Sequence, residues 1–339
     1  MKIYKGNPFF KNSLLLIFVV SFGYALIINS GYFGYGIDYY NSYNLGSQKS
    51  ANYWDTIGWT ISTLEIFENK VGIFLVAFIL SVSSGLLIRT FFKNFFLYSI
   101  TLFLTIYILT IFSWPIIVST SNSMRQGLAM CFIFTSLLSF FNNNKILGLI
   151  FIIIATFTHK SGIFFAVNTF YTYSSILLYK YICKKKKITD SNIFFVISGF
   201  CYFILITIII YTLQLIPDLR LSAVIIESNI SIALDFRIPF LLISFLFIMI
   251  FILKSNLFLN NYINYFIFYF SISSTAIFLA GLNWQYERLM MMMIIPYILA
   301  IGLCFTKKSV YLYFMIMFFS LFILTLLTGM YTIGIGVFF

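Results

Sequence analysis

The chain has little charge and one histidine. Only 9% of its 339 residues are charged, while 61% are hydrophobic. This balance excludes a soluble domain, because a soluble chain of this length could not hide so much apolar surface from water. With one histidine, no cysteine cluster and no carboxylates at helical spacing, a histidine-based metal site is not expected either. We therefore expect no protein-held metal and no cofactor.

Cysteines, repeats and linkers are also scarce. The four cysteines are scattered, without the spacing of a disulfide framework or a zinc site. No internal repeat of fixed period and no low-complexity linker is present, so we expect one integral-membrane domain, residues 1–339. Most basic residues of this chain, whose net charge is +12, stand between apolar runs, where they orient spans rather than bind nucleic acid.

Long apolar runs predict an all-α polytopic membrane protein. A span needs about 20 apolar residues. The sequence offers about eleven candidate spans, at 13–30, 71–88, 95–118, 124–141, 146–158, 163–181, 191–215, 238–253, 262–282, 289–306 and 309–329. With a cytoplasmic N-terminus, read as a retained signal anchor, the inner junctions hold 14 of the 21 basic residues, as the positive-inside rule requires.

The same orientation places eight of the nine acidic residues outside, so we expect the chemistry there. Two outer segments, 31–70 and 216–237, are long enough to cover a site. The fifth candidate span is too short to cross unaided. His159, which follows it, is therefore expected below the outer surface, in a cavity.

Several expected inward helices begin with cations. Arg125 follows a Ser-Asn-Ser run that can cap its helix, where helix dipole and guanidinium together would bind phosphate oxygens. Arg288, Arg237 and the His159-Lys160 pair, with Ser161 as a cap, repeat the placement. The alternatives are cations that extend to the interface and a histidine hydrogen-bonded between helices. The pattern suits a lipid-linked diphosphate, with His159 as a base or a phosphate ligand.

The first outer segment is aromatic. Its aromatic residues stand among Gly, Asn and Ser: Tyr32, Phe33, Tyr35, Tyr39, Tyr40, Tyr43, Tyr53, Trp54 and Trp59. Aromatic rings beside carboxylates suit a carbohydrate surface, and a membrane-interface belt is the alternative. Asp38 is either a general base for a sugar hydroxyl or a solvated loop carboxylate.

One stretch resembles a known family. In "MRQGLAMCFIFTSLLSFFNNNKILGLIFIIIATFTHKSGIFF", Arg125, Ala129, Ala155, His159 and Ser161 occupy positions similar to the hallmark of the EpsG family of Wzy-like polysaccharide polymerases. The "GIDYYNSY" run, with Asp38 and Tyr43, and the "YERLMMM" run, with Arg288, resemble two further motifs of that family.

The resemblance implies a glycosyltransferase-C-like bundle in the bacterial cytoplasmic membrane. This enzyme would join polyprenyl-diphosphate-linked oligosaccharides, as donor and acceptor, into O-antigen, capsule or exopolysaccharide, with a chain-length regulator as a possible partner. We expect His159, Asp38 and Arg125 to be catalytic. The residues expected to bind substrate are Arg288, Arg237, Arg220, Lys160, Ser161, Gln126, Tyr39 and Tyr43.

Two other functions fit the same cations and histidine. A membrane O-acyltransferase can use a lone histidine to activate a hydroxyl, and a lipid-linked oligosaccharide transporter can bind the same anion without chemistry. Nothing in an acyltransferase requires several outer arginines. A transporter is often built from two repeated halves, and the sequence shows none. The polymerase is therefore preferred.

Overall fold

We describe the protein from a computed structural model. The described residues are 8–31, 56–64, 71–94, 99–121, 123–142, 144–159, 161–186, 285–302, 307–327 and a few between 194 and 208. Within these ranges the regular structure is helical and contains no strand. The all-α class expected from the sequence is therefore confirmed for this part of the chain.

Ten helices are described. Their bounds are α1 Pro8–Asn29, α2 Thr56–Ser62, α3 Val71–Asn94, α4 Ile100–Ile111, α5 Trp114–Ser121, α6 Met124–Phe141, α7 Lys145–Thr158, α8 Ser161–Lys186, α13 Gln285–Gly302 and α14 Lys307–Leu327. Among the described residues, α1, α3, α6 and α14 are long and apolar enough to cross a membrane, and α4 with α5 can form a fifth, broken span. The expected spans at 238–253 and 262–282, and most of 191–215, lie outside the described residues.

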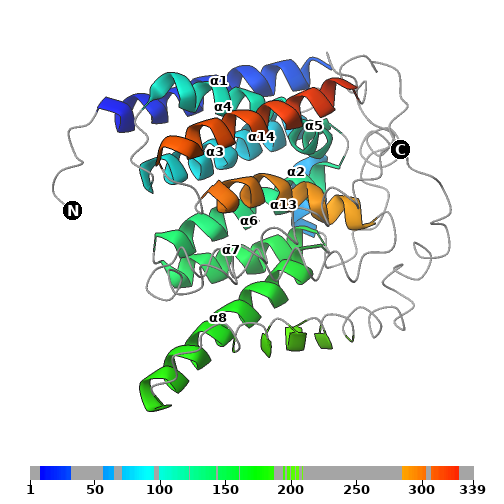
Figure 1. The fold of residues 1–339 in the computed structure, drawn as a ribbon. Helices are drawn as coiled ribbons and strands as arrows, with labels where there is room; N and C mark the ends of the chain where they lie inside the picture. The colour runs from blue at the N-terminus through cyan, green and yellow to red at the C-terminus, as the bar shows by residue number, and fades with distance from the viewer. Residues whose placement is uncertain are drawn as a thin grey trace. The chain divides into compact units, whose positions relative to one another are not determined.

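The chain divides into two compact units, residues 1–163 with 294–339, and residues 164–293. In the first unit α3 packs between α1 and α6, and α6 forms an antiparallel pair with α7 (Figure 1). In the second unit the Tyr171 hydroxyl of α8 donates to the Ser198 carbonyl at 2.6 Å. The candidate residues with described side chains all belong to the first unit.

Apolar side chains cover the outside of the first unit. Large exposed residues follow one face of α1, including Leu15, Phe18 and Val19, and a second set follows α7, including Ile146 and Ile153. Contact of such apolar side chains with lipid is favourable, whereas their contact with water is unfavourable. In the interior, the Tyr107 hydroxyl meets Ser21 Oγ at 2.6 Å and donates to the Ser81 carbonyl at 3.1 Å, so this core polar group is satisfied within the protein.

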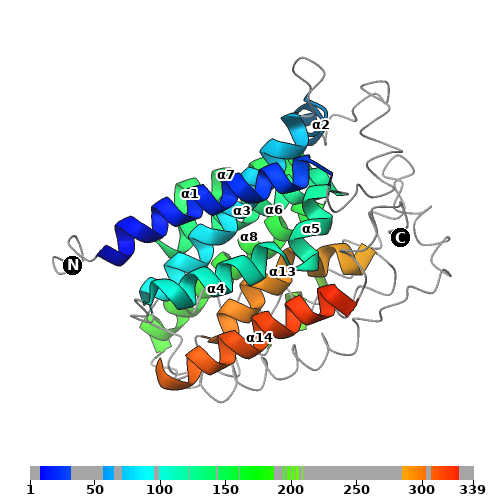
Figure 2. The same ribbon diagram turned by 90° about the horizontal axis from the view of Figure 1, so that it is seen from above.

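The candidate span at 95–118 is not one continuous helix. The helix ends at Ile111, restarts at Trp114 and bends by 51° between α4 and α5. Pro115, in the first turn of α5, has no N–H to continue the ladder. The Trp114 N–H instead donates to Thr325 Oγ1 of α14 at 2.8 Å, which holds the break in place. The change of direction between α4 and α5 can be followed in Figure 2.

We expect Thr325→Val to destabilise the first unit by about 1–3 kcal/mol, because the buried Trp114 N–H loses this acceptor while the side-chain shape is kept. Unfolding in mixed micelles measures the change. Thr105→Val is the matched control, since that half-buried residue donates its hydroxyl to the Thr101 carbonyl of its own helix, in a bond that is exposed. Equal stability of the two variants would contradict the role given to the Thr325 hydroxyl.

The backbones of α5 and of the first turn of α6 approach each other closely. A Cβ on Gly127 would overlap the Ser119 carbonyl oxygen, so only glycine allows these helices to meet. The Ser123 N–H also donates to the Val118 carbonyl at 2.8 Å. These contacts fix the first turn of α6, which carries Arg125.

Candidate functional site

Arg125 is the second residue of α6, and its side chain is half-buried. The helix has Ser123 at its N-cap, but the Ser123 side chain makes no capping hydrogen bond. The Ser123 side chain therefore does not supply the cap expected from the Ser and Asn residues before this helix, and Asn122 lies outside the described residues. Backbone N–H groups at a helix start carry partial positive charge, and Arg125 adds a full charge at the same place.

An aromatic ring lies against Arg125. The guanidinium carbon of Arg125 stands 3.9 Å from the centroid of the Trp59 ring, a cation–π distance. Trp59 belongs to α2, which lies between α1 and α3 in the chain and packs on both α6 and α7. The segment 31–70, which the sequence predicts to be an outer segment, thus supplies a contact to the candidate cation.

Gly58 packs against both the Arg125 side chain and the end of α7. A Cβ at Gly58 would overlap the Thr158 carbonyl oxygen and would stand 3.1 Å from Arg125 Cγ and 3.2 Å from Arg125 Cβ. Gly58 is buried, and the absence of a side chain is what permits α2 to sit here. Arg125 and the residue before His159 therefore share one neighbour, at one end of the α6–α7 pair.

His159 ends α7 and supports the start of α8. Its backbone is extended, with φ −156° and ψ 143°, and its own N–H donates to the Ala155 carbonyl at 3.1 Å. The ring Nδ1 accepts the Ser161 N–H at 3.2 Å and lies 2.7 Å from Ser161 Oγ. The predicted Ser161 cap is corrected by this geometry, because the imidazole accepts the N–H at the start of α8.

The contact from the Ser161 N–H favours one tautomer of the His159 ring. An N–H donor needs a lone pair, so the Nδ1 that accepts the Ser161 N–H carries no hydrogen, and the Ser161 hydroxyl lies 2.7 Å from the same nitrogen. The neutral ring then carries its hydrogen on Nε2. The basic nitrogen of this tautomer, Nδ1, is engaged with Ser161.

Other predicted positions are only partly described. Gln126 is 1% exposed, and the family positions Ala129 and Ala155 are fully buried in α6 and α7. Arg288 lies in the first turn of α13, as a helix-opening cation, but its side chain is outside the described set. The remaining predicted residues also lie outside the described ranges: Asp38, Tyr39, Tyr43, Lys160, Arg220 and Arg237.

Sequence reasoning missed the part that α2 plays. Trp59 stood out only as one of many aromatics, and Gly58 did not stand out at all. The available signal was the Gly-Trp pair in a short helix-compatible stretch before the second span. That signal does not predict a contact between Trp59 and Arg125, because 66 positions separate the two residues in the chain.

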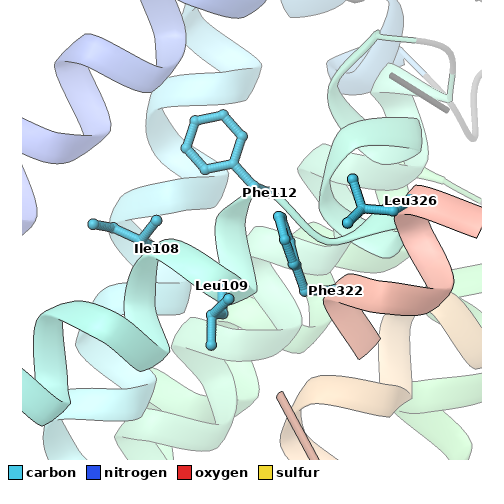
Figure 3. A pocket seen from close by; sticks show the side chains of 5 residues that line it. All are labelled: Ile108, Leu109, Phe112, Phe322 and Leu326. Carbon is cyan, nitrogen blue, oxygen red and sulfur yellow. The ribbon is translucent and has the colours of Figure 1, made fainter. Parts of the chain in front are cut away.

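A separate groove opens at the α4–α5 break. Ile108, Leu109, Phe112, Phe322 and Leu326 line a space of about 360 Å³ between α4 and α14 (Figure 3). With hydrocarbon walls alone, the groove offers no group for sugar or phosphate chemistry. Among the described residues, no three His, Cys, Asp or Glu side chains are grouped to hold a metal ion.

The spans and the apolar exterior define a multi-pass membrane protein with a cation and an imidazole at one end of a helix pair. The chain belongs to the EpsG family, whose pattern matches residues 10–337, nearly the whole length. Membership implies, in a general sense, a Wzy-like polysaccharide polymerase. Searches among curated proteins and among solved structures give no match.

Proposed function

We propose that the protein is a glycosyltransferase that joins polyprenyl-diphosphate-linked oligosaccharide repeat units into a surface polysaccharide. The reaction takes place on the outer face of a bacterial cytoplasmic membrane, and the N-terminus is cytoplasmic. The observation that carries the proposal is the Arg125 guanidinium at the start of α6, held over the Trp59 ring and beside the helix end that leads to His159. Family membership supports the same activity.

The proposed reaction is a displacement at the anomeric carbon of the donor. A hydroxyl of the acceptor unit forms the new glycosidic C–O bond, the C–O bond to the diphosphate breaks, and polyprenyl diphosphate leaves with the bonding electron pair. Arg125 and the N–H groups at the start of α6 bind the diphosphate oxygens as their charge grows. In a poorly hydrated site such preorganised charges contribute several kcal/mol to the transition state.

His159 acts in this proposal as a hydrogen-bond donor through Nε2, not as the base. The Nδ1 that would have to accept a proton already receives the Ser161 N–H. The hydroxyl proton then goes to a carboxylate, and Asp38 is the candidate that the family resemblance offers. Donation from Nε2 to a phosphate or sugar oxygen supplies part of the same charge stabilisation.

A reconstitution experiment tests the proposed function. The full chain in lipid nanodiscs receives a defined polyprenyl-diphosphate-linked repeat unit, and the products are sized on a gel. We expect a ladder whose step is one repeat unit, with polyprenyl diphosphate released in equal amount. A repeat unit that stays single while it gains an acyl group, or only crosses a bilayer, would reject polymerisation.

Two substitutions of His159 separate a donor from a base. In His159→Gln the amide nitrogen reaches the region of Nε2, so we expect polymerisation to be largely retained. In His159→Asn the amide oxygen can still accept the Ser161 N–H and keep the turn, but no donor reaches the distal position. For this variant we expect a loss of about tenfold or more, the scale of one charged hydrogen bond.

Polymerisation rates in nanodiscs, with melting temperatures alongside, make this comparison. His159→Asn is the matched control for folding, since it preserves the cap. An equal loss of about 10²–10⁴-fold in both variants would indicate a general base and contradict the donor role.

A further inference from the structure

Trp59, which contacts Arg125, is not among the site residues that the sequence or the family resemblance indicates. We propose that Trp59 is a positioning residue for Arg125: its ring supports one flat face of the guanidinium and orients the N–H edge toward the diphosphate of the substrate. The proposal rests on the proposed function, in which Arg125 binds that diphosphate.

The distance between the two groups supports a stacked contact. The guanidinium carbon lies 3.9 Å from the Trp59 ring centroid, well within the range of an attractive cation–π pair. All five N–H groups of a guanidinium lie in its plane and point outward from its edge. A ring against the flat face therefore leaves the bidentate donor geometry intact while it restricts rotation of a long side chain.

The position of Trp59 is itself fixed. Gly58, its neighbour, is buried against the Thr158 carbonyl and the aliphatic part of Arg125, with no room for a Cβ. The Thr63 hydroxyl and N–H both bond to the Trp59 carbonyl, at 2.8 and 3.0 Å, which closes the end of α2. Trp59 thus stands on a short helix seated on both α6 and α7, and its ring position is set independently of the substrate.

The benefit expected from such support is pre-organisation. An unsupported arginine loses rotamer freedom when it binds an anion, which weakens binding. A supported arginine has lost that freedom already in the folded protein. Trp59 should therefore strengthen anion binding through Arg125, without itself contacting the diphosphate.

A double-mutant cycle tests this role. The full chain in detergent micelles is titrated with farnesyl diphosphate, a short isoprenoid diphosphate, and Kd is measured for wild type, Trp59→Leu, Arg125→Lys and the double variant. We expect Trp59→Leu to raise Kd by about tenfold, the upper part of the cation–π range. In the Arg125→Lys background the same change should raise Kd by less than about twofold, because lysine lacks the planar fork.

Rescue and a control on the same helix complete the test. Trp59→Phe keeps an aromatic face and should stay within about threefold of wild type. Thr60→Ala should leave Kd unchanged, because the Thr60 side chain is exposed and bonds only to Thr56 of its own helix at 2.9 Å. Melting temperatures of all variants report whether α2 remains folded.

The outcomes separate the two proposals. If Arg125→Lys leaves Kd unchanged, the diphosphate role of Arg125 fails, and the proposed function loses its main support. If Arg125→Lys weakens binding but Trp59→Leu costs the same factor in both backgrounds, only the positioning role of Trp59 is overturned.

Discussion

Replacing Arg125 by alanine is expected to stop polymerisation almost completely, with a loss of about 10²–10³-fold in rate. The variant removes the only described guanidinium at this end of the α6–α7 pair, and the leaving diphosphate then departs without that charge. Arg125→Lys should retain part of the activity, since it keeps the charge and loses the planar fork. Gel sizing of the glycan, in cells and in nanodiscs, measures both effects.

Lys145→Ala is the matched control for this prediction. It removes one positive charge from the first residue of α7, at the opposite end of the same helix pair, and should leave chain length unchanged. In cells carrying Arg125→Ala, single lipid-linked units should still reach the outer face. Units trapped inside would favour a transporter, and normal chains without acetyl groups would favour an acyltransferase.

Adding one methyl group at Gly58 is expected to be nearly as damaging. The Cβ of Gly58→Ala would overlap the Thr158 carbonyl oxygen, which is backbone and cannot rotate away. Helix α2 must then shift, and Trp59 moves away from Arg125 with it. A displacement of about 1 Å at a positioning group can cost about 10²-fold in rate, and the strain itself destabilises the fold by about 1–3 kcal/mol.

Gly23→Ala on α1 is the appropriate comparison, because the added Cβ there meets no atom within 4 Å. Alanine in that helix should be neutral or stabilising by about 0.5–1 kcal/mol. Polymerisation rates and unfolding curves of the two variants, measured side by side, test the difference. If Gly58→Ala behaves like Gly23→Ala, the close packing of α2 against the end of α7 does not matter for the site.

The sequence predicted the individual helices better than their mutual contacts. The bounds of α6 were predicted to the residue and those of α7 within one residue, because both are apolar runs with polar residues at their ends. The break between α4 and α5 was not predicted, although Pro115 lies next to it. Residues 95–118 form a nearly continuous apolar run, so hydropathy alone predicts one span there.

The candidate site was predicted only in part. Arg125 and His159 were identifiable because charged residues stand out in an apolar chain. Their neighbours Gly58 and Trp59 were not, because the lack of space at Gly58 exists only once α2, α6 and α7 meet. The hydrogen position on the His159 ring also depends on three-dimensional geometry, namely the placement of the Ser161 N–H.

The length of α7 has a consequence for the surrounding bilayer. Its 14 residues extend over roughly 21 Å, whereas a hydrocarbon core is about 30 Å thick. The exposed apolar face of α7 includes Ile146, Ile150 and Ile153 and requires lipid contact over that shorter distance. We therefore expect the membrane beside this helix to thin, and activity to depend on acyl-chain length, with shorter-chain lipids matching the protein better.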